Sequence, residues 1–155
     1  MEQEKLTPAQ ALQKVRQYCA YQERSHSEVK DKLYGYGLYR NEVEEILSQL
    51  IQENYLNEER FAIQFAGGKF RMKQWGRTKI KYELRKRQVS EYCIRKALVS
   101  LDEEAYEESL KKLFEEKCQS LRSEKNIFIK KKKIQSYLLQ KGYESGLVNE
   151  LLQSL

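Results

Sequence analysis

Apolar residues recur along this chain at a helical spacing. In residues 43–50 and again in residues 148–155 they occupy positions i, i+3, i+4 and i+7, which lie on one face of an α-helix. The chain contains one proline, Pro8, and seven glycines, so it lacks the turn residues that separate the strands of a sheet. The pattern predicts an all-α fold.

Three polar residues are placed to begin helices. Thr7 is followed by Pro8 and, three residues after the threonine, by a glutamine, which is the pattern of a capping box with proline at the first helical position. Ser25 is followed by a glutamate at the same distance. Asn57 precedes two glutamates, whose charges favour a helix N-terminus. We therefore expect helices to begin just after these three residues.

The same apolar pattern occurs three times. Aligning Leu33 with Leu84 and Leu138 brings the later apolar positions of the three segments into register without further adjustment. The equivalent residues include Val29, Ile80 and Ile134; Gly37, Gln88 and Gly142; and Val43, Ile94 and Val148. The alignment predicts three tandem repeats, at residues 1–55, 56–102 and 103–155.

Each repeat is predicted to contain three helices. The first is long, and is expected at residues 9–24, 58–75 and 103–121. Two shorter helices follow, joined by a tight turn at which Gly37 and Gly142 suit a left-handed backbone, whereas Gln88 adopts it at a cost. The short pair resembles a helix-turn-helix. Because units of about 50 residues are small for independent folding, we expect them to stack into an elongated, curved, solenoid-like molecule.

Charge is distributed unevenly along the chain. The formal net charge is +6, yet residues 66–87 contain nine basic side chains and one acidic one, and residues 122–133 contain six basic and one acidic. Residues 41–60 and 102–117 are acidic, with net charges of −5 and −4. A basic surface binds phosphate backbones or an acidic protein, although a run of charges can also be a solvated helix face. The local density of charge favours binding.

The predicted binding residues come from the two basic segments. They are Lys69, Arg71, Lys73, Trp75, Arg77, Lys79, Lys81 and Lys86 in the first, and Lys130, Lys131, Lys132 and Lys133 in the second. Ile80 and Leu84 are expected to define the buried face of a short helix, with lysines on both flanks. The basic side chains are expected to be exposed, so that charge reversal at Arg71, Arg77 and Lys79 leaves the fold intact.

Two features of the first basic segment allow alternative interpretations. Trp75 is suited either to stacking on a base or a partner, or to anchoring the packing between units. Gly67 and Gly68 lie inside a predicted long helix, where glycine costs about 1 kcal/mol relative to alanine. They indicate either a helix break or a close approach of two backbones.

Catalytic chemistry is not predicted. The chain has no phosphate-binding loop, no HExxH zinc motif and no GxSxG nucleophile motif. His26, the only histidine, lies in a capping segment and is expected to be exposed, whereas Cys19, Cys93 and Cys118 are expected to be buried thiols. We expect no catalytic residue, no bound metal and no cofactor.

The sequence also predicts a cytoplasmic location. No run of about 18 apolar residues is present, so no membrane partner is expected. The first ten residues have neither the apolar core of a secretory signal nor the basic character of a transit peptide.

Several motifs resemble the RecX family of recombination regulators. The most specific are LNEERFA at residues 56–62, GKFR at 68–71 and WGRTKI at 75–80. Arg24-Ser25 with Glu28, Leu33 and Gly37 resembles the opening motif of that family. The likeness covers nearly the whole chain, and the last third matches only in its apolar pattern. Asn57-Glu58 and Arg87-Gln88 depart from the usual residues.

This resemblance implies three tandem three-helix repeats, no enzymatic activity and binding to the RecA recombinase filament on DNA. Members of the family lodge in the helical groove of the filament and inhibit its ATPase, strand-exchange and coprotease activities. Direct DNA binding is expected to be weak and non-specific, and the protein is expected to be a monomer. The alternative is a stand-alone DNA- or RNA-binding helix-turn-helix module. A third interpretation is a scaffold whose basic patch serves solubility alone.

Overall fold

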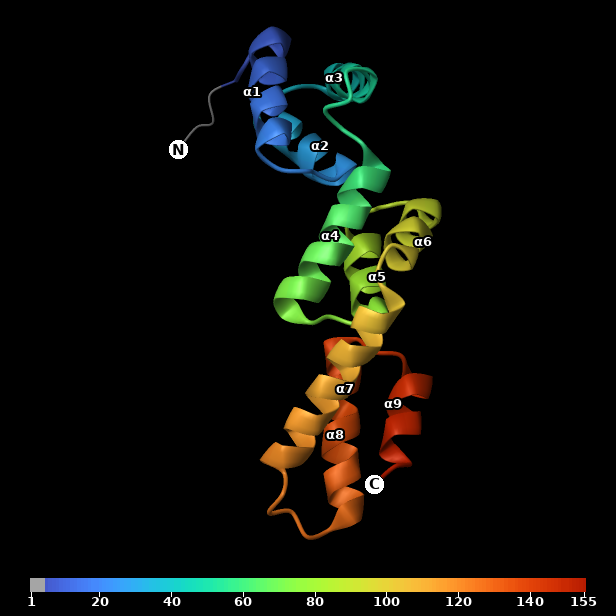
Figure 1. Ribbon diagram of the computed structural model, residues 1–155. Helices are drawn as coiled ribbons and strands as arrows, with labels where there is room; N and C mark the ends of the chain where they lie inside the picture. Colours follow the sequence, from blue (N-terminus) through green and yellow to red (C-terminus); the bar gives the residue numbers. More distant parts are fainter. Residues whose placement is uncertain (1–4) are drawn as a thin grey trace. The chain divides into compact units, whose positions relative to one another are not determined.

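The computed structural model describes residues 5–155 as an array of α-helices (Figure 1). Their bounds are α1 (Pro8–Tyr21), α2 (His26–Gly35), α3 (Arg40–Gln52), α4 (Glu58–Lys73), α5 (Arg77–Lys86), α6 (Glu91–Val99), α7 (Glu103–Ser120), α8 (Ile127–Lys141) and α9 (Ser145–Leu152). No strand occurs in this part of the chain, which confirms the all-α prediction. Residues 1–4, the start of the N-terminal stretch discussed above, lie outside the described residues.

The three predicted helix starts are confirmed. Thr7 caps α1 in a reciprocal box: its Oγ1 accepts the N–H of Gln10 at 3.2 Å, and its own N–H donates to the Gln10 side chain at 3.1 Å. Ser25 and Asn57 each accept the backbone N–H of the residue three positions further on, at 3.1 and 2.8 Å. Each cap satisfies an N–H that the first helical turn leaves unpaired.

The repeat predicted from the apolar alignment is present in the backbone. Gly37, Gln88 and Gly142 all have positive φ, at 86°, 60° and 100°. The residues at the positions of Leu33 and Val29 are fully buried in all three copies. The residues at the position of Val43 are at most 1% exposed. The three segments therefore share one local fold, while the exact domain limits at residues 55 and 102 stay a prediction.

Gln88 is the one non-glycine residue at this equivalent turn position, and we expect Gln88→Gly to stabilise the protein. The left-handed conformation costs a non-glycine residue about 1–2 kcal/mol, against about 0.5–1 kcal/mol for the extra freedom of glycine in the unfolded chain. The expected gain in the free energy of unfolding is about 0.5–1 kcal/mol, measured by urea denaturation. Gln140→Gly, at an exposed position inside α8, is the control and should lose about 1 kcal/mol. A Gln88→Gly variant no more stable than its parent would contradict the strain argument.

The chain divides into two compact units, each with its own packing. The first comprises Met1–Gln64 and Leu84–Lys96, and the second comprises Phe65–Glu83 and Ala97–Leu155. The core of the first unit is formed by α1, α2 and α3 and includes Ala11, Val15, Val29, Leu33, Val43, Leu47 and Leu50. In the same unit, the N–H of Ser90 donates to Glu58 at 2.7 Å, and the Ser27 hydroxyl donates to the carbonyl of Arg87 at 3.0 Å.

The second unit contains a close approach of two backbones at Gly76 and Gly142. A Cβ added at Gly76 would lie 2.4 Å from the carbonyl carbon of Gly142, and a Cβ added at Gly142 would lie 2.3 Å from the Cβ of Lys79. The N–H of Gly76 donates to the carbonyl of Lys141, and the N–H of Thr78 donates to that of Gly142, both at 2.9 Å. The start of α5 is therefore bonded to the end of α8.

Of the two interpretations of Gly67 and Gly68, the helix break is wrong. Helix α4 runs through both residues to Lys73. A Cβ at Gly67 would meet only the flexible Arg71 guanidinium, at 2.8 Å, and a Cβ at Gly68 would meet nothing within 4 Å. The backbone approach that was considered for this pair occurs instead at Gly76.

His26 is half-buried, so the expectation that it is exposed is wrong. It is the first residue of α2, its Nδ1 lies 3.8 Å from a Glu58 carboxylate oxygen, and its Nε2 is buried with no partner among the described residues. Burial lowers the pKa of the imidazole and nearby Lys30 lowers it further, while Glu58 acts in the opposite direction. Burial also opposes ionisation of Glu58, but hydrogen bonds from Ser90 bring the pKa of this carboxyl below its usual value.

We expect the first unit to lose stability as the pH falls through about 6.5, the usual pKa of histidine. Below that pH the unfolded chain takes up a proton at His26 that the folded protein binds less readily, so the free energy of unfolding decreases. Urea denaturation at pH 7 and pH 5.5 measures the change. Because the chain has a single histidine, His26→Gln should remove most of it. Equal pH dependence in parent and variant would contradict the assignment.

Two of the three cysteines are buried, as predicted. Cys19 and Cys93 lie in the interior of the first unit, and burial raises the pKa of the Cys19 thiol to about 11. Cys118 on α7 is half-buried, so the expectation of a buried thiol is wrong for this residue. High thiol pKa values favour the unreactive protonated form.

Candidate functional site

Three lysines surround the only tryptophan of the chain, in the connection between α4 and α5. The ammonium nitrogens of Lys69, Lys73 and Lys79 lie 5.2, 5.8 and 4.7 Å from the centroid of the Trp75 ring. We refer to these four residues as the tryptophan–lysine cluster. All four belong to the second unit.

The local sequence explains this convergence. Lys69 and Lys73 are four residues apart on the last turns of α4, so their side chains share one face of the helix. Gln74 has a φ of 59° and its N–H donates to the carbonyl of Phe70 at 3.0 Å, which ends α4 and turns the chain back. Trp75 follows at once, and Lys79 lies in the first turn of α5.

Trp75 is held at one edge and is partly exposed. The ring of Phe65 packs against it edge-on, with centroids 6.4 Å apart. Lys69 also lies over Phe65, at 5.5 Å. Within the second unit, one edge of Trp75 packs against Phe65 and the ring also faces lysine side chains. Stacking of Trp75 on a base or a partner stays a prediction.

The cluster concentrates positive charge on an aromatic surface. Each ammonium gains about 0.5–1 kcal/mol from the ring, but the three like charges repel one another. Within residues 5–155, no ion pair to a carboxylate is formed by these three lysines. An anion placed among them would relieve the repulsion, and a flat group could stack on the indole. The cluster is therefore suited to a phosphate backbone or to a carboxylate-rich protein face.

Arg77 is half-buried and paired, so the expectation that its side chain is exposed is wrong, while its part in binding a partner stays a prediction. Its guanidinium donates to Glu144 at 2.9 Å and to Glu103, and its carbon lies 3.8 Å from the centroid of the Tyr106 ring. Its side chain is 20% exposed. Two carboxylates neutralise the charge, and burial leaves little of it available to a partner.

Tyr106 links the Arg77 network to the start of α5. Its hydroxyl accepts the backbone N–H of Arg77 at 3.0 Å and donates to the Glu144 carboxylate. Burial, followed by this hydrogen bond to Glu144, raises the pKa of the Tyr106 hydroxyl. Burial also opposes the charge on Arg77, but Glu144 raises the pKa of its guanidinium above the usual value. The network holds the start of α5, and with it Lys79, in place.

The remaining predicted residues are spread over several helices. Arg71 is exposed on α4, Lys81 is half-exposed on α5, and Lys86 is exposed at the end of α5. The run Lys130, Lys131, Lys132 and Lys133 lies on α8, where the first two are half-buried and the last two exposed. Lys133 lies 3.8 Å from a Glu124 carboxylate oxygen. The tryptophan–lysine cluster is thus the part of the predicted site that the fold brings together.

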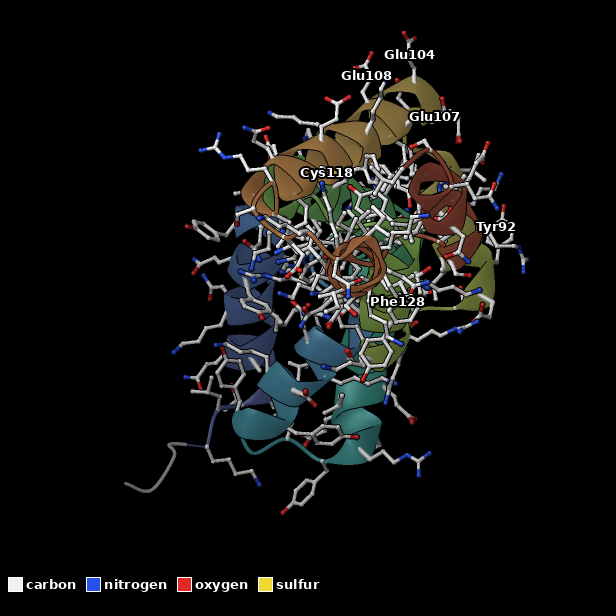
Figure 2. The ribbon with its side chains drawn as sticks, turned by 90° about the horizontal axis from the view of Figure 1, so that it is seen from below. Tyr92, Glu104, Glu107, Glu108, Cys118 and Phe128 are labelled. Carbon is white, nitrogen blue, oxygen red and sulfur yellow. The ribbon has the colours of Figure 1, made fainter. Side chains whose placement is uncertain are left out.

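An acidic face lies on α7 in the same unit. Glu104, Glu107 and Glu108 are exposed and project outward from this helix (Figure 2). These three residues form a solvated acidic face within the acidic segment at residues 102–117. Glu103 is also exposed, but it pairs with Arg77.

Sequence reasoning missed three residues that shape the site: Phe65, Tyr106 and Glu144. Phe65 lies ten residues before Trp75, and no local spacing in the sequence predicts that its ring packs edge-on against the indole. Tyr106 and Glu144 reach Arg77 only through the approach of α7 and α8 to α5. Gly76 was the one sequence feature that could have indicated this approach, because a glycine allows another backbone to come close.

Comparison with known proteins gives consistent results. Family models for the second and the third three-helix domain of RecX match residues 57–98 and 104–152. The regulatory protein RecX of Clostridium perfringens strain 13 is 30% identical over 133 residues, covering 85% of this chain and 62% of that protein. That of Prosthecochloris aestuarii is 27% identical over 151 residues, covering 94% and 93%. The chain therefore spans less than two thirds of the Clostridium relative.

Solved structures show the same fold. The crystal structure of RecX from Lactobacillus salivarius superposes with a TM-score of 0.84 at 24% identity, covering 96% of both chains. A second crystal structure, of a regulatory protein RecX, also gives 0.84, at 25% identity, covering 96% of this chain and 72% of the other.

Three repeated helical segments define a helical-repeat protein, and its second unit carries a cation-rich aromatic cluster. No helix among residues 5–155 combines the length and apolar character that membrane crossing requires. With both domain models and the solved structures in agreement, the chain belongs to the RecX family.

Proposed function

We propose that this protein is a non-enzymatic cytoplasmic regulator of the RecA recombinase. It binds the RecA filament on DNA, in the helical groove of the filament, and inhibits the ATPase, strand-exchange and coprotease activities. Family membership supports the class of partner, because the relatives are named regulatory proteins. The observation that carries the proposal for this chain is the tryptophan–lysine cluster, which places three ammonium groups around one ring.

The cluster is proposed to contact either DNA phosphates or acidic side chains inside the groove. DNA alone should bind weakly and with strong salt dependence, because we expect counterion release at the lysines to be the main source of affinity. The acidic face of α7 carries Glu104, Glu107 and Glu108, and repels a phosphate backbone. The presence of both basic and acidic surfaces supports a partner made of protein and DNA together. We propose that the protein binds this partner as a monomer, through its basic surface.

A stand-alone nucleic-acid-binding module is the second candidate. The observation that favours it is the partly exposed Trp75 ring, because base stacking on an aromatic residue requires no partner protein. Such a module would reduce RecA activity only by competing for DNA.

The DNA-dependent ATPase of the cognate RecA, measured with and without this protein, tests the proposal. Filaments are assembled on a limited amount of single-stranded DNA, and the titration is then repeated with DNA in large excess. A regulator bound to the filament should inhibit in both conditions. Inhibition that disappears in excess DNA would identify a competitor for DNA, and no inhibition in either condition would overturn the proposal.

The division of the chain into functional repeats at residues 1–55, 56–102 and 103–155 is part of the same proposal. The central repeat supplies the tryptophan–lysine cluster, and we propose that it makes the principal contact with the filament. Variants of residues in each repeat, assayed as full-length protein, would establish which repeat contributes most.

A further inference from the structure

A second aromatic and basic surface lies in the first unit, far in sequence from the tryptophan–lysine cluster. It is a groove between α1 and α2, and we refer to it as the tyrosine groove. Its lining residues are Lys14, Gln17, Tyr18, Tyr21, Arg24, Lys32 and Tyr36. Neither the basic segments nor the family motifs singled out this combination.

The spacing of the lining residues explains how the groove forms. Lys14, Gln17, Tyr18 and Tyr21 follow the positions i, i+3, i+4 and i+7, so they form one stripe along α1. This stripe lies beside the buried positions of the helix, which are Ala11, Val15 and Cys19. Lys32 and Tyr36, four residues apart at the end of α2, form the opposite wall.

Cations are stacked on the tyrosine rings. The Arg24 guanidinium carbon lies 3.6 Å from the centroid of the Tyr18 ring and 6.0 Å from that of Tyr21, and the Lys32 ammonium lies 5.1 Å from Tyr18. Arg24 is fixed because its Nε–H donates to the carbonyl of Tyr18 at 3.0 Å. Tyr21 is 83% exposed. The groove therefore places a partly exposed planar guanidinium beside an open aromatic ring.

The charge of this part of the groove is positive. Lys14, Arg24 and Lys32 line it, and none of its lining residues within residues 5–155 is acidic. The carboxylates of Glu28 and Asp31 line the neighbouring part, towards Leu6, and would repel a phosphate there. A complementary ligand has negative charges at one edge and flat, unpaired faces at the other.

We propose that the tyrosine groove binds single-stranded nucleic acid. One base stacks on Tyr21 and a neighbouring base stacks on the guanidinium of Arg24, since every base offers a face to such a platform. The phosphates between them contact Lys14 and Lys32. A duplex is a poor ligand, because its base faces are already stacked on one another. An acidic peptide would gain binding free energy from the cations but not from stacking on the aromatic ring.

This site differs from the one used in the proposed function, so the two can fail separately. The tryptophan–lysine cluster lies in the second unit and is tested through RecA ATPase. The tyrosine groove is tested by the binding of DNA to this protein in the absence of RecA. Failure of the DNA-binding test would leave the proposed regulation of RecA untouched, and failure of the ATPase test would leave the tyrosine groove untouched.

The experiment measures fluorescence anisotropy of a labelled 12-nucleotide oligo-dT and of a 12-base-pair duplex with the full-length protein at low salt. The test variant is Tyr21→Ala with Lys32→Ala, both at exposed positions. The matched control is Tyr92→Ala with Lys96→Ala on α6, where an exposed tyrosine also has a lysine over its ring, at 5.6 Å (Figure 2). Both variants lose one aromatic ring and one charge.

We expect the test variant to bind oligo-dT at least about fivefold more weakly than the parent, which is the lower bound for one stacked base. The control variant should lose less than twofold, and duplex affinity should change equally in both variants. Equal losses of oligo-dT affinity in the test and control variants would overturn the proposal. So would a test variant whose loss is the same for single strand and duplex, because that result indicates charge without stacking.

Photocrosslinking provides an independent measurement. An oligonucleotide carrying 5-iododeoxyuridine crosslinks to aromatic side chains stacked on the modified base. Crosslinked peptides from the parent should contain Tyr21 or Tyr18. Crosslinks confined to peptides outside α1 and α2 would overturn the assignment of the groove even if the anisotropy had changed.

Discussion

Charge reversal of the tryptophan–lysine cluster, by Lys69→Glu, Lys73→Glu and Lys79→Glu, should abolish most inhibition of the RecA ATPase. Three charge contacts at about 0.5–1 kcal/mol each correspond to about a 10- to 100-fold rise in the concentration needed for half-inhibition. The fold should persist, because these lysines form no ion pair within residues 5–155 that the substitutions would break. ATPase titrations and circular dichroism measure the two effects.

The lysines of α8 are the matched control for this variant. Lys130→Glu, Lys131→Glu and Lys132→Glu make the same change in net charge, also within the second unit. They should raise the half-inhibiting concentration by a smaller factor, because they lie outside the aromatic cluster and in the part of the chain that least resembles the family motifs. Full inhibition by the folded cluster variant, or equal losses in both variants, would refute the basic-surface mechanism. Arg77 is left out of the test, because its reversal would break the pairs with Glu103 and Glu144.

Gly142→Ala should destabilise the protein more than any surface substitution. Its φ of 100° is strained for alanine, and the new Cβ would lie 2.3 Å from the Cβ of Lys79 and 2.8 Å from its backbone nitrogen. Strain of about 1–3 kcal/mol and a steric cost of similar size together predict a loss of more than about 3 kcal/mol. Urea denaturation followed by circular dichroism measures the loss.

Gly146→Ala is the control for the Gly142 variant. Gly146 lies in α9, without a positive φ, and an added Cβ would meet nothing within 4 Å. This substitution should raise the free energy of unfolding by about 0.5–1 kcal/mol, because alanine favours the helix. If Gly142→Ala were no less stable than Gly146→Ala, the bond between the start of α5 and the end of α8 would not hold the second unit together.

Local sequence features predicted the helices well, because their causes lie within a few residues. The Thr7 box, the Ser25 and Asn57 caps and the apolar spacing all act over three or four positions. The repeat alignment predicted a left-handed residue at Gln88, which standard preference would not place there, and φ at that residue is 60°. The glycines at the equivalent positions of the other two copies made this prediction possible, because Gln88 alone does not indicate a left-handed backbone.

Predictions about individual charged groups succeeded less often. Arg77 belongs to a dense basic run and has no acidic neighbour in sequence, so an exposed position was the natural expectation. Glu103 and Glu144, 26 and 67 residues further along, neutralise it. His26 lies in a capping segment, yet it is half-buried beside Glu58. In both cases a distant carboxylate changed the environment, and the sequence around the residue contains no trace of that partner.

The amino-acid sequence alone predicts nine helical segments within residues 5–155, three of their capping residues and the threefold pattern, because hydrophobic periodicity and hydrogen-bond capping are short-range effects. Which cations remain available for binding depends instead on tertiary packing. Helix α8 must approach α5 at Gly76 before Glu144 can pair with Arg77. Likewise, α4 must turn at Gln74 before three lysines can surround Trp75. Electrostatic environment is set by groups that are close in space, and their separation along the chain does not reveal it.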